Sequence, residues 1–149
     1  MKKVLALVLA LTMVLGMGSV ALAEGNAQVF WYTMSDTYLA SVRTALNAKL
    51  DEAGITYVDQ DGNATQTTQT DQITTAIATG TDLLAVNIVE TGADGIAQNV
   101  VDQAKAAGIP LLFFNRSVSE DVVKSYDKCC FCLLNTSPSP RDISGSRMP

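Results

Sequence analysis

The stretch Val29–Arg43, VFWYTMSDTYLASVR, decides the fold because two periodicities meet within it. Its first residues form an apolar run rich in aromatic and β-branched side chains, which is typical of a buried strand. Its second half carries apolar residues at helical spacing, and Asp36 or Ser35 stands where a helix cap belongs. We therefore expect a strand that leads directly into a helix, with a polar corner between them that suits a ligand.

The same alternation continues along the chain. Further apolar runs predict strands at Ile55–Val58, Leu83–Ile88, Leu111–Phe114 and Lys128–Phe131. Helices are expected from the Asp36 corner to Gly54, over Gln66–Thr79 and over Ala93–Ala107, with inward-facing Leu39, Val42, Leu46, Leu50, Ile73, Ala76, Ile77, Ile96, Val100, Val101 and Ala104. The glycines at 54, 80 and 108 are expected to end these helices. A polar turn at Asp59–Asn63 and a loop from Asn115 to Asp127 complete the prediction.

Strands and helices that alternate with short loops predict an α/β fold, a doubly wound parallel sheet with helices on both faces. Right-handed crossovers favour the flavodoxin-like strand order 2-1-3-4-5, in which the sheet reverses between the first and third strands. Ligands bind outside the carboxyl ends of the strands at this reversal. Asp36 follows the first strand and Asn87 ends the third, so we expect the two side chains to flank a binding crevice.

The first 23 residues have the pattern of a secretory signal peptide rather than of part of the fold. Two lysines precede the apolar run Val4–Leu15, and Ala21-Leu22-Ala23 forms a small-residue cleavage site. Cleavage after Ala23 would make the mature protein periplasmic or secreted. The mature chain keeps eight basic and fifteen acidic residues, a net charge of −7, which argues against nucleic acid as a partner.

Residues 24–131 are expected to form one α/β lobe. The segment 132–149, which ends in NTSPSPRDISGSRMP (Asn135–Pro149), has no periodicity and no apolar face, so we expect it to be disordered and foreign to the protein. The cysteines Cys129, Cys130 and Cys132 lie in one cluster. An odd, clustered set without a distant partner favours small apolar residues of a buried strand over a disulfide or a metal site.

No catalytic centre or metal site can be assembled from the sequence. The chain has no histidine, which removes the commonest general base and the commonest metal ligand. The first corner, MSDTYL (Met34–Leu39), lacks the G-x-G-x-x-G of a dinucleotide site, and no nucleophile–base pair can be named. The sequence therefore predicts a binding protein that is not an enzyme and carries no cofactor in this lobe.

With these elements in place, residues from about Ala27 to Phe131 resemble the amino-terminal lobe of the periplasmic galactose/glucose-binding proteins of sugar ABC transporters. The resemblance rests on SDTYLASVRTAL (Ser35–Leu46), QTDQITTAIATG (Gln69–Gly80), LLAVNIVE (Leu83–Glu90), IPLLFFNR (Ile109–Arg116) and KSYDKCCF (Lys124–Phe131). It implies two α/β lobes joined by a hinge that close on one monosaccharide. The second lobe, which in several members also holds calcium, would lie beyond Phe131.

The resemblance also implies site residues. In that family an Asp and an aromatic residue at the first corner and an Asn at the end of the third strand contact the sugar, and Asp36, Tyr38 and Asn87 match them. A carboxylate accepts hydrogen bonds from hydroxyls, an amide donates and accepts them, and a tyrosine ring covers the apolar face of a pyranose. Each residue has a plainer alternative: a helix cap for Asp36, a packing or surface residue for Tyr38, and a turn former for Asn87.

Three further residues are weaker candidates for ligand contact. Asn115 and Arg116 end the fourth strand and could line the crevice, although Arg116 could equally form a surface salt bridge to Glu120 or Asp121. Tyr32 lies beside the first corner, but an aromatic residue at that position more often belongs to the core. All three stand at the same predicted edge of the sheet as Asp36 and Asn87.

The sequence thus favours an extracytoplasmic solute-binding protein for a galactose- or glucose-type monosaccharide. Its expected partners are a membrane ABC permease and, as a further possibility, a chemoreceptor, and the protein is expected to be a monomer. A sugar-sensing effector domain of a repressor has the same lobe architecture, but a DNA-binding helix-turn-helix would then stand where the signal peptide is. An enzyme on a flavodoxin-like fold is the remaining alternative, and it lacks a catalytic pair.

Overall fold

The computed structural model describes residues 25–132, so the predicted signal peptide and nearly all of the predicted tail lie outside the described residues. Strands and helices alternate over this range: β1 (Asn26–Trp31), α2 (Thr37–Glu52), β2 (Thr56–Asp61), α3 (Gln66–Thr79), β3 (Leu83–Val86), α4 (Asp94–Ala107), β4 (Leu111–Phe114), α5 (Glu120–Lys124) and β5 (Cys129–Cys132). The strands form one parallel sheet in the order β2-β1-β3-β4-β5. The predicted doubly wound α/β fold and its strand order are confirmed.

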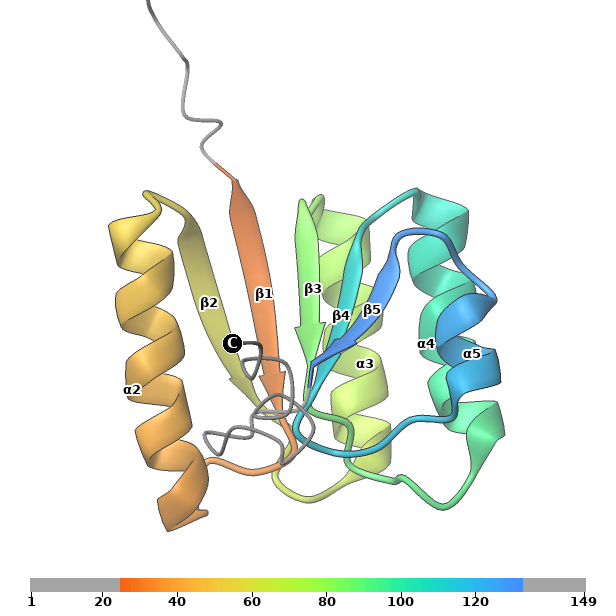
Figure 1. The fold of residues 1–149 in the computed structure, drawn as a ribbon, viewed down its shortest axis with the longest axis horizontal. Coiled ribbons are helices and arrows are strands. Elements are labelled where there is room, and N and C mark those ends of the chain that lie inside the picture. The colour runs from red at the N-terminus through yellow and green to blue at the C-terminus, as the bar shows by residue number, and fades with distance from the viewer. Residues whose placement is uncertain (1–24, 133–149) are drawn as a thin grey trace, which may run out of the picture.

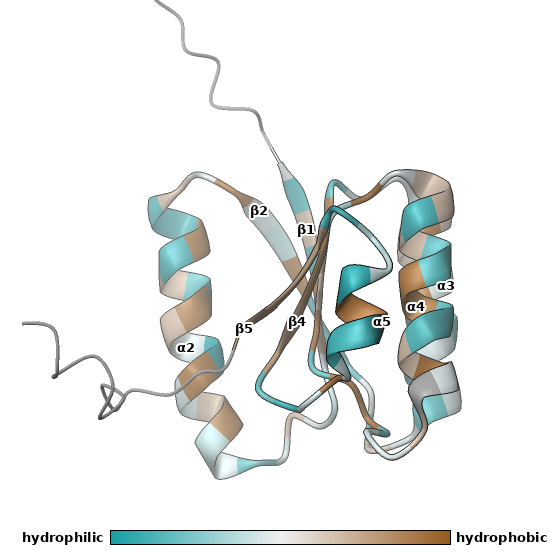
Figure 2. Cartoon of the chain, turned by 45° about the vertical axis from the view of Figure 1, so that its right-hand side comes forward, coloured by the Kyte–Doolittle hydropathy of each residue, from teal (hydrophilic) through white to brown (hydrophobic). Residues whose placement is uncertain are grey.

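Helices cover both faces of this sheet (Figure 1). On one face α2 packs over β1, where Leu39 joins Val29 and Trp31 in a small buried cluster. On the other face lie α3, α4 and α5. Figure 2 shows β4 and β5 as hydrophobic along their length, whereas the helices carry hydrophilic residues on their outer sides. Within residues 25–132, no helix is long and apolar enough to cross a membrane.

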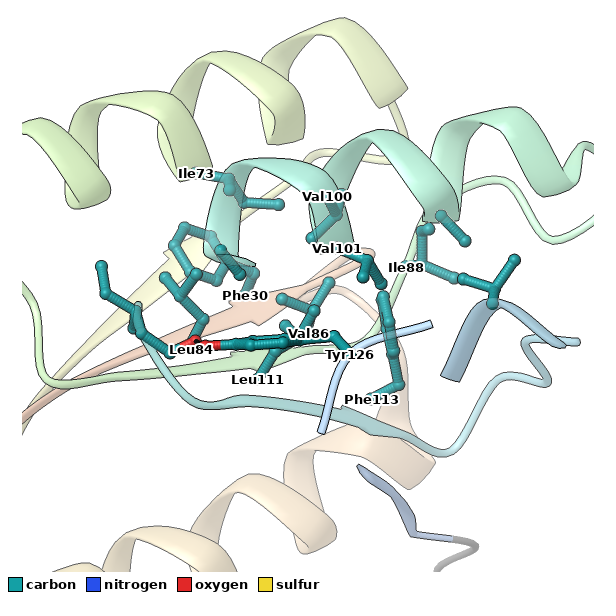
Figure 3. Close-up of a cluster of buried hydrophobic side chains, with 14 of the residues drawn as sticks. Phe30, Ile73, Leu84, Val86, Ile88, Val100, Val101, Leu111, Phe113 and Tyr126 are labelled. Atoms are coloured by element: carbon teal, nitrogen blue, oxygen red, sulfur yellow. Dashed lines mark hydrogen bonds between the residues drawn. The ribbon is translucent and has the colours of Figure 1, made fainter. Parts of the chain in front are cut away.

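The larger hydrophobic core lies between the sheet and the pair α3 and α4 (Figure 3). Ile73 reaches it from α3, Val100 and Val101 from α4, and Phe113 from β4, and all four are at most 1% exposed. Its other buried members are Phe30, Ala76, Leu84, Val86, Ile88, Ala97, Ala104, Ile109, Leu111, Val122 and Tyr126. This layer fixes the positions of β1, β3 and β4, and therefore of the loops that follow them.

Glycines end three of the helices as predicted, and the first is Gly54, which follows the C-cap of α2 with φ 68°. Gly80 follows α3 with φ 86° and Gly108 follows α4 with φ 72°, and in both cases the left-handed conformation suits glycine. The helix α3 runs over the predicted residues Gln66–Thr79. The ends of helices are thus predicted most accurately where a cap or a glycine marks them.

Strand β2 is longer than expected, and the predicted turn at Asp59–Asn63 is partly wrong. Asp59 lies inside the strand opposite Val29 of β1, where Trp31 Nε1 donates to its Oδ1 at 2.7 Å and Asn47 Nδ2 donates to its Oδ2 at 2.8 Å. These bonds satisfy a charged residue that would otherwise be unfavourable in a half-buried strand. Strand β3, by contrast, ends at Val86 and leaves Asn87 in the loop that follows it.

The predicted loop from Asn115 to Asp127 contains the helix α5. Only Val122 of its five residues is buried, so the segment carries no helical periodicity in the sequence. Acidic residues in its first turn and Lys124 in its last turn favour the helix through its dipole. A single turn of this kind depends on its contact with the core rather than on its own propensity.

The prediction that the cysteines are buried in a strand is wrong for two of the three. Cys130 and Cys132 are exposed, and Cys129 is half-buried. β5 is an edge strand whose residues alternate between the two faces, with Cys129 packed against the larger core. Cys130 lies opposite Leu112 and Cys132 opposite Phe114, on the face that carries α2. α2 covers the other end of the sheet, so these two thiols remain accessible.

We expect the three thiols to react with iodoacetamide in a fixed order at about pH 8. Burial raises the pKa of Cys129 to about 11, so this thiol should be modified much more slowly than the exposed Cys130 and Cys132. Mass spectrometry of peptides after timed alkylation measures the order. Fast modification of Cys129 in the folded protein would show that the register of β5 is wrong.

Candidate functional site

Polar side chains gather where the carboxyl ends of three neighbouring strands meet. β1 leads into Tyr32 and Asp36, β3 ends one residue before Asn87, and β4 leads into Asn115 and Arg116. Because β1 pairs with β3 and β3 pairs with β4, these residues follow adjacent strands at one edge of the sheet. The structure therefore brings the predicted site residues to a common edge, at the reversal in strand order.

Asp36 caps the helix α2 and also binds the strand end that precedes it. Its Oδ1 accepts hydrogen bonds from the backbone N–H groups of Tyr38 (2.8 Å) and Leu39 (3.1 Å), and its Oδ2 accepts one from the Tyr32 hydroxyl at 2.5 Å. The Tyr32 hydrogen bond, followed by that from Leu39, lowers the pKa of Asp36 below its ordinary value. Asp36 is thus a fixed, ionised carboxylate, and Oδ2 keeps a lone pair for a further donor.

Arg116 ties the three strand ends together. Its guanidinium carbon lies 4.2 Å from the centre of the Tyr32 ring, a cation–π contact. Its Nη1 donates to the backbone carbonyls of Ile88 (3.2 Å) and Val89, in the loop after β3. Arg116 therefore connects the end of β4 both to the loop after β3 and, through Tyr32, to Asp36 at the end of β1.

The sequence left two roles open for Arg116, and the structure shows a third. Glu120, one of the acids considered as its surface partner, pairs instead with Lys124 at 2.5 Å. The hydrogen bonds of Arg116 to the main chain hold the half-buried side chain beside Tyr32. A direct contact of Arg116 or Tyr32 with a ligand stays a prediction.

Replacement of Tyr32 by phenylalanine is expected to raise the pKa of Asp36 toward its ordinary 3.8, because it removes the largest cause of the lowering. A carboxyl with a lowered pKa stabilises the fold above its unfolded pKa and loses this contribution as the pH falls through its folded pKa. The variant should therefore lose the ionised cap of α2 at a higher pH than the parent. NMR titration of the Asp36 carboxyl carbon measures this.

Tyr57→Phe is the matched control for that titration. Tyr57 also carries a raised pKa, caused first by burial and next by the charge of Asp51, but it lies on β2 near the far end of α2. Its replacement should leave the pKa of Asp36 unchanged. If both variants give Asp36 the same pKa as the parent, the Tyr32 hydrogen bond does not hold this carboxylate.

Asn87 is fully buried, and its main chain is firmly held. Its backbone N–H donates to the Phe30 carbonyl at 2.8 Å, and its own carbonyl accepts from Gln69 Nε2 at 3.0 Å. Neither Oδ1 nor Nδ2 of its side chain has a hydrogen-bond partner among the described residues. Leaving a buried polar group unpaired costs about 1–3 kcal/mol. A turn former would bond to its own backbone, so this alternative does not explain the side chain.

Tyr38 and Asn115 lie at the margins of this edge. Tyr38 stands in the first turn of α2 and is 55% exposed, so it is a surface residue rather than a core residue of the helix. Asn115 adopts a left-handed backbone with φ 65°, which Asn tolerates better than most residues. Its backbone N–H donates to the Cys132 carbonyl at 3.1 Å. Ligand contact by these two residues stays a prediction.

Asp61 and Gly62, at the end of β2, were missed as parts of this edge. Asp61 Oδ1 accepts from the backbone N–H groups of Met34 (3.1 Å) and Asn63 (2.8 Å), which fixes the first corner. The Gly62 N–H donates to the Trp31 carbonyl at 2.8 Å, and a Cβ on Gly62 would lie 2.8 Å from the same oxygen. The Asp-Gly-Asn run at 61–63 is a strong turn signal that could have located this contact.

Two hollows in the described part of the chain lie away from this edge. One of about 360 Å³ is lined by Gln28, Gln60, Thr68, Asp71, Gln72, Thr75, Ala76 and Thr79, and one of about 450 Å³ by Asp51, Gly54, Ile55, Thr56 and Tyr57. None of the predicted site residues lines either hollow. Over residues 25–132, no cluster of three or more His, Cys, Asp or Glu residues could hold a metal ion.

The family of the chain follows from its match over the whole of this sheet. A family model described as a periplasmic binding protein domain matches residues 26–131, which extend from the start of β1 into β5. The chain belongs to this family. The predictions of a periplasmic-binding-protein lobe and of a binding protein rather than an enzyme are confirmed.

Individual relatives agree with this assignment. The chain is 28% identical over 141 residues to the D-galactose/methyl-galactoside binding periplasmic protein of Haemophilus influenzae, in an alignment that covers 93% of this chain and 41% of that protein. The predicted resemblance to galactose-binding proteins is thereby confirmed. The chain spans less than half the length of this relative.

Solved structures show the same fold. An ABC transporter solute binding protein from Bacillus halodurans with bound myo-inositol gives a TM-score of 0.61 at 21% identity, covering 76% of this chain and 37% of the other. A periplasmic solute binding protein from Actinobacillus succinogenes with bound D-allose gives 0.59 at 16% identity, covering 68% and 35%. In each case this chain corresponds to about a third of the solved protein.

Proposed function

We propose that this chain is the amino-terminal lobe of an extracytoplasmic solute-binding protein that binds a monosaccharide of the galactose or glucose type for uptake by an ABC transporter. The observation that carries the proposal is the buried, unpaired side-chain amide of Asn87 at the same strand edge as the ionised carboxylate of Asp36. The relative that binds D-galactose and methyl-galactoside supports this choice of sugar.

The chemistry of the edge suits hydroxyl groups. Asp36 can accept a hydrogen bond from a hydroxyl with its remaining lone pair on Oδ2, and Asn87 can both donate and accept. The exposed ring of Tyr38 supplies an apolar surface for the C–H face of a pyranose. Asn115, Arg116 and Tyr32 complete the proposed set, with Arg116 also supplying positive charge beside the ring of Tyr32.

One lobe of a two-lobed clamp presents a strand edge that the second lobe covers when the clamp closes. A ligand held between two lobes contacts each with about half of its surface, and closure excludes water from both. The lobe by itself therefore binds weakly, with a Kd on the order of 1 mM or above. Tight binding requires a second lobe. We propose that the full-length protein has one, because this chain covers only 41% of its galactose-binding relative.

The remaining expectations concern the protein outside the described residues. Export through a signal peptide cleaved after Ala23, docking to a membrane permease, recognition by a chemoreceptor and a monomeric state are consistent with the family and stay proposals. A calcium site in the second lobe stays a prediction about residues beyond this chain. The net charge of −7 that the sequence gives the mature chain provides no reason to expect nucleic acid as a partner.

Fluorescence titration tests the proposal because the chain has one tryptophan, Trp31. Its buried ring meets Phe114 edge-on at 5.1 Å between ring centres, and it directly precedes Tyr32. D-galactose and D-glucose should each give a saturable change in emission, stronger than D-allose or myo-inositol. Tetraethylene glycol is the control for nonspecific solute effects. No saturable response to any of the four polyols, or an equal response to the glycol, contradicts the proposal.

A further inference from the structure

Three glutamines of α3 point along one side of the helix. Gln66, Gln69 and Gln72 follow each other at intervals of three residues, which places them on one face. Each side-chain amide bonds to the main chain at the end of a strand or in the loop that follows it. Glutamine is an unusual choice for a helix face that packs against a sheet, so the row requires a reason.

Gln69 makes two hydrogen bonds to the loop after β3. It is fully buried, its Nε2 donates to the Asn87 carbonyl at 3.0 Å, and its Oε1 accepts from the Val89 N–H at 3.0 Å. β3 ends at Val86, and its pairing with β4 stops there as well. The side-chain amide of Gln69 therefore replaces a neighbouring strand for the two residues that flank Ile88.

The other two glutamines extend this contact. Gln66 Oε1 accepts from the Glu90 N–H at 3.0 Å, one residue beyond the segment that Gln69 holds. Gln72 Nε2 donates to the Asp61 carbonyl at 2.8 Å, at the end of β2. One face of α3 thus fixes the backbone at the ends of two strands, β2 and β3, that lie on either side of β1.

We propose that Gln69 is a positioning residue for the ligand site: it holds the backbone of residues 87–89 so that the side-chain amide of Asn87 keeps one orientation. The identity of the ligand in this inference rests on the proposed function, whereas the holding of the loop by Gln69 rests on the hydrogen bonds alone. A buried amide that served packing alone could be replaced by an apolar side chain at no loss, since its own desolvation is costly. The two matched hydrogen bonds to the loop explain why an amide stands there.

Gln69→Met tests this because methionine has nearly the same length and shape but cannot bond to the loop. Gln103→Met on α4 is the matched control: Gln103 also makes two hydrogen bonds, to Asn99 (2.7 Å) and from Thr74 (3.0 Å), but both are to side chains away from the strand ends. The first measurement is hydrogen exchange of backbone amides without ligand. The Val89 amide should exchange at least about tenfold faster in Gln69→Met, and at the parent rate in Gln103→Met.

The second measurement is the D-galactose affinity of the same variants, which should fall at least about fivefold for Gln69→Met and stay unchanged for Gln103→Met. Two results would overturn the proposal by showing a purely structural role. The first is that Gln69→Met accelerates exchange of the Val86 and Val89 amides equally. The second is that the parent binds galactose and Gln69→Met binds it with the same affinity. If the parent binds no sugar, the proposed function fails, and the exchange result alone decides whether Gln69 positions the loop.

Should Gln69→Met fail to fold, Gln66→Met replaces it. Gln66 is only half-buried, so its loss leaves the core intact. Faster exchange of the Glu90 amide, with a smaller loss of affinity, supports the role of the row. An unchanged Glu90 amide contradicts it.

Discussion

Replacement of Asn87 by leucine is expected to remove monosaccharide binding while the free energy of unfolding stays the same or rises. The side chain of Asn87 is fully buried, and neither of its polar atoms has a partner among residues 25–132. Leucine has the same branched arrangement of side-chain heavy atoms, with two bulkier methyl groups in place of the polar atoms, so it removes a desolvation cost of about 1–3 kcal/mol without opening a cavity. The hydrogen bonds to the sugar are lost, and affinity should fall at least about tenfold.

Urea unfolding and galactose titration of the same preparation measure the two effects. Asn99→Leu is the control, because Asn99 lies on the exposed side of α4 and should change neither quantity by much. A clear loss of stability in Asn87→Leu would show that the amide has a structural partner. Unchanged galactose affinity would remove Asn87 from the site.

Replacement of Phe113 by alanine should unfold most of the chain. Phe113 is fully buried in the middle of the larger core, on β4 between β3 and β5 (Figure 3). Removing a buried phenylalanine costs about 3–5 kcal/mol, and the total stability of a small domain is only about 5–15 kcal/mol. A loss of this size removes most of the stability of a domain in the lower part of that range.

Thermal unfolding followed by far-UV circular dichroism measures this loss. Val58→Ala is the control, since Val58 is 45% exposed on β2 and should shift the midpoint only slightly. A Phe113→Ala variant as stable as Val58→Ala would mean that β4 does not occupy the centre of the sheet.

The sequence predicted the parts of the fold that local signals mark. Apolar runs located β1, β3 and β4, and the glycines at 80 and 108 located the ends of α3 and α4. Asp36 was recognised as a cap because Asx residues satisfy the free N–H groups at the start of a helix. The strand order followed from the handedness of the crossovers, and it placed Asp36 and Asn87 at one edge.

The features that were missed depend on contacts between residues far apart in the sequence. Asp59 pairs with Val29 inside the sheet, and its carboxylate is accommodated there by hydrogen bonds from Trp31 and Asn47. The contact of Arg116 with Tyr32 joins residues from different strands, and no spacing rule predicts it. The glutamines of α3 bind main-chain groups that lie outside the helix, so no local pattern shows what they contact. Sequence reasoning thus found the edge of the sheet, but not what holds it in place.

The most direct test of the central claim is an NMR map of D-galactose binding to this chain. We predict saturable shifts of the Asn87 side-chain amide and of the Tyr38 and Leu39 backbone amides, because Asp36 and Asn87 would bond to the sugar. The side-chain amides of Gln28 and Gln60, in the hollow beside α3, should not move. Shifts confined to that hollow, or no saturable shift at all, would contradict the assignment of the strand edge as a sugar site.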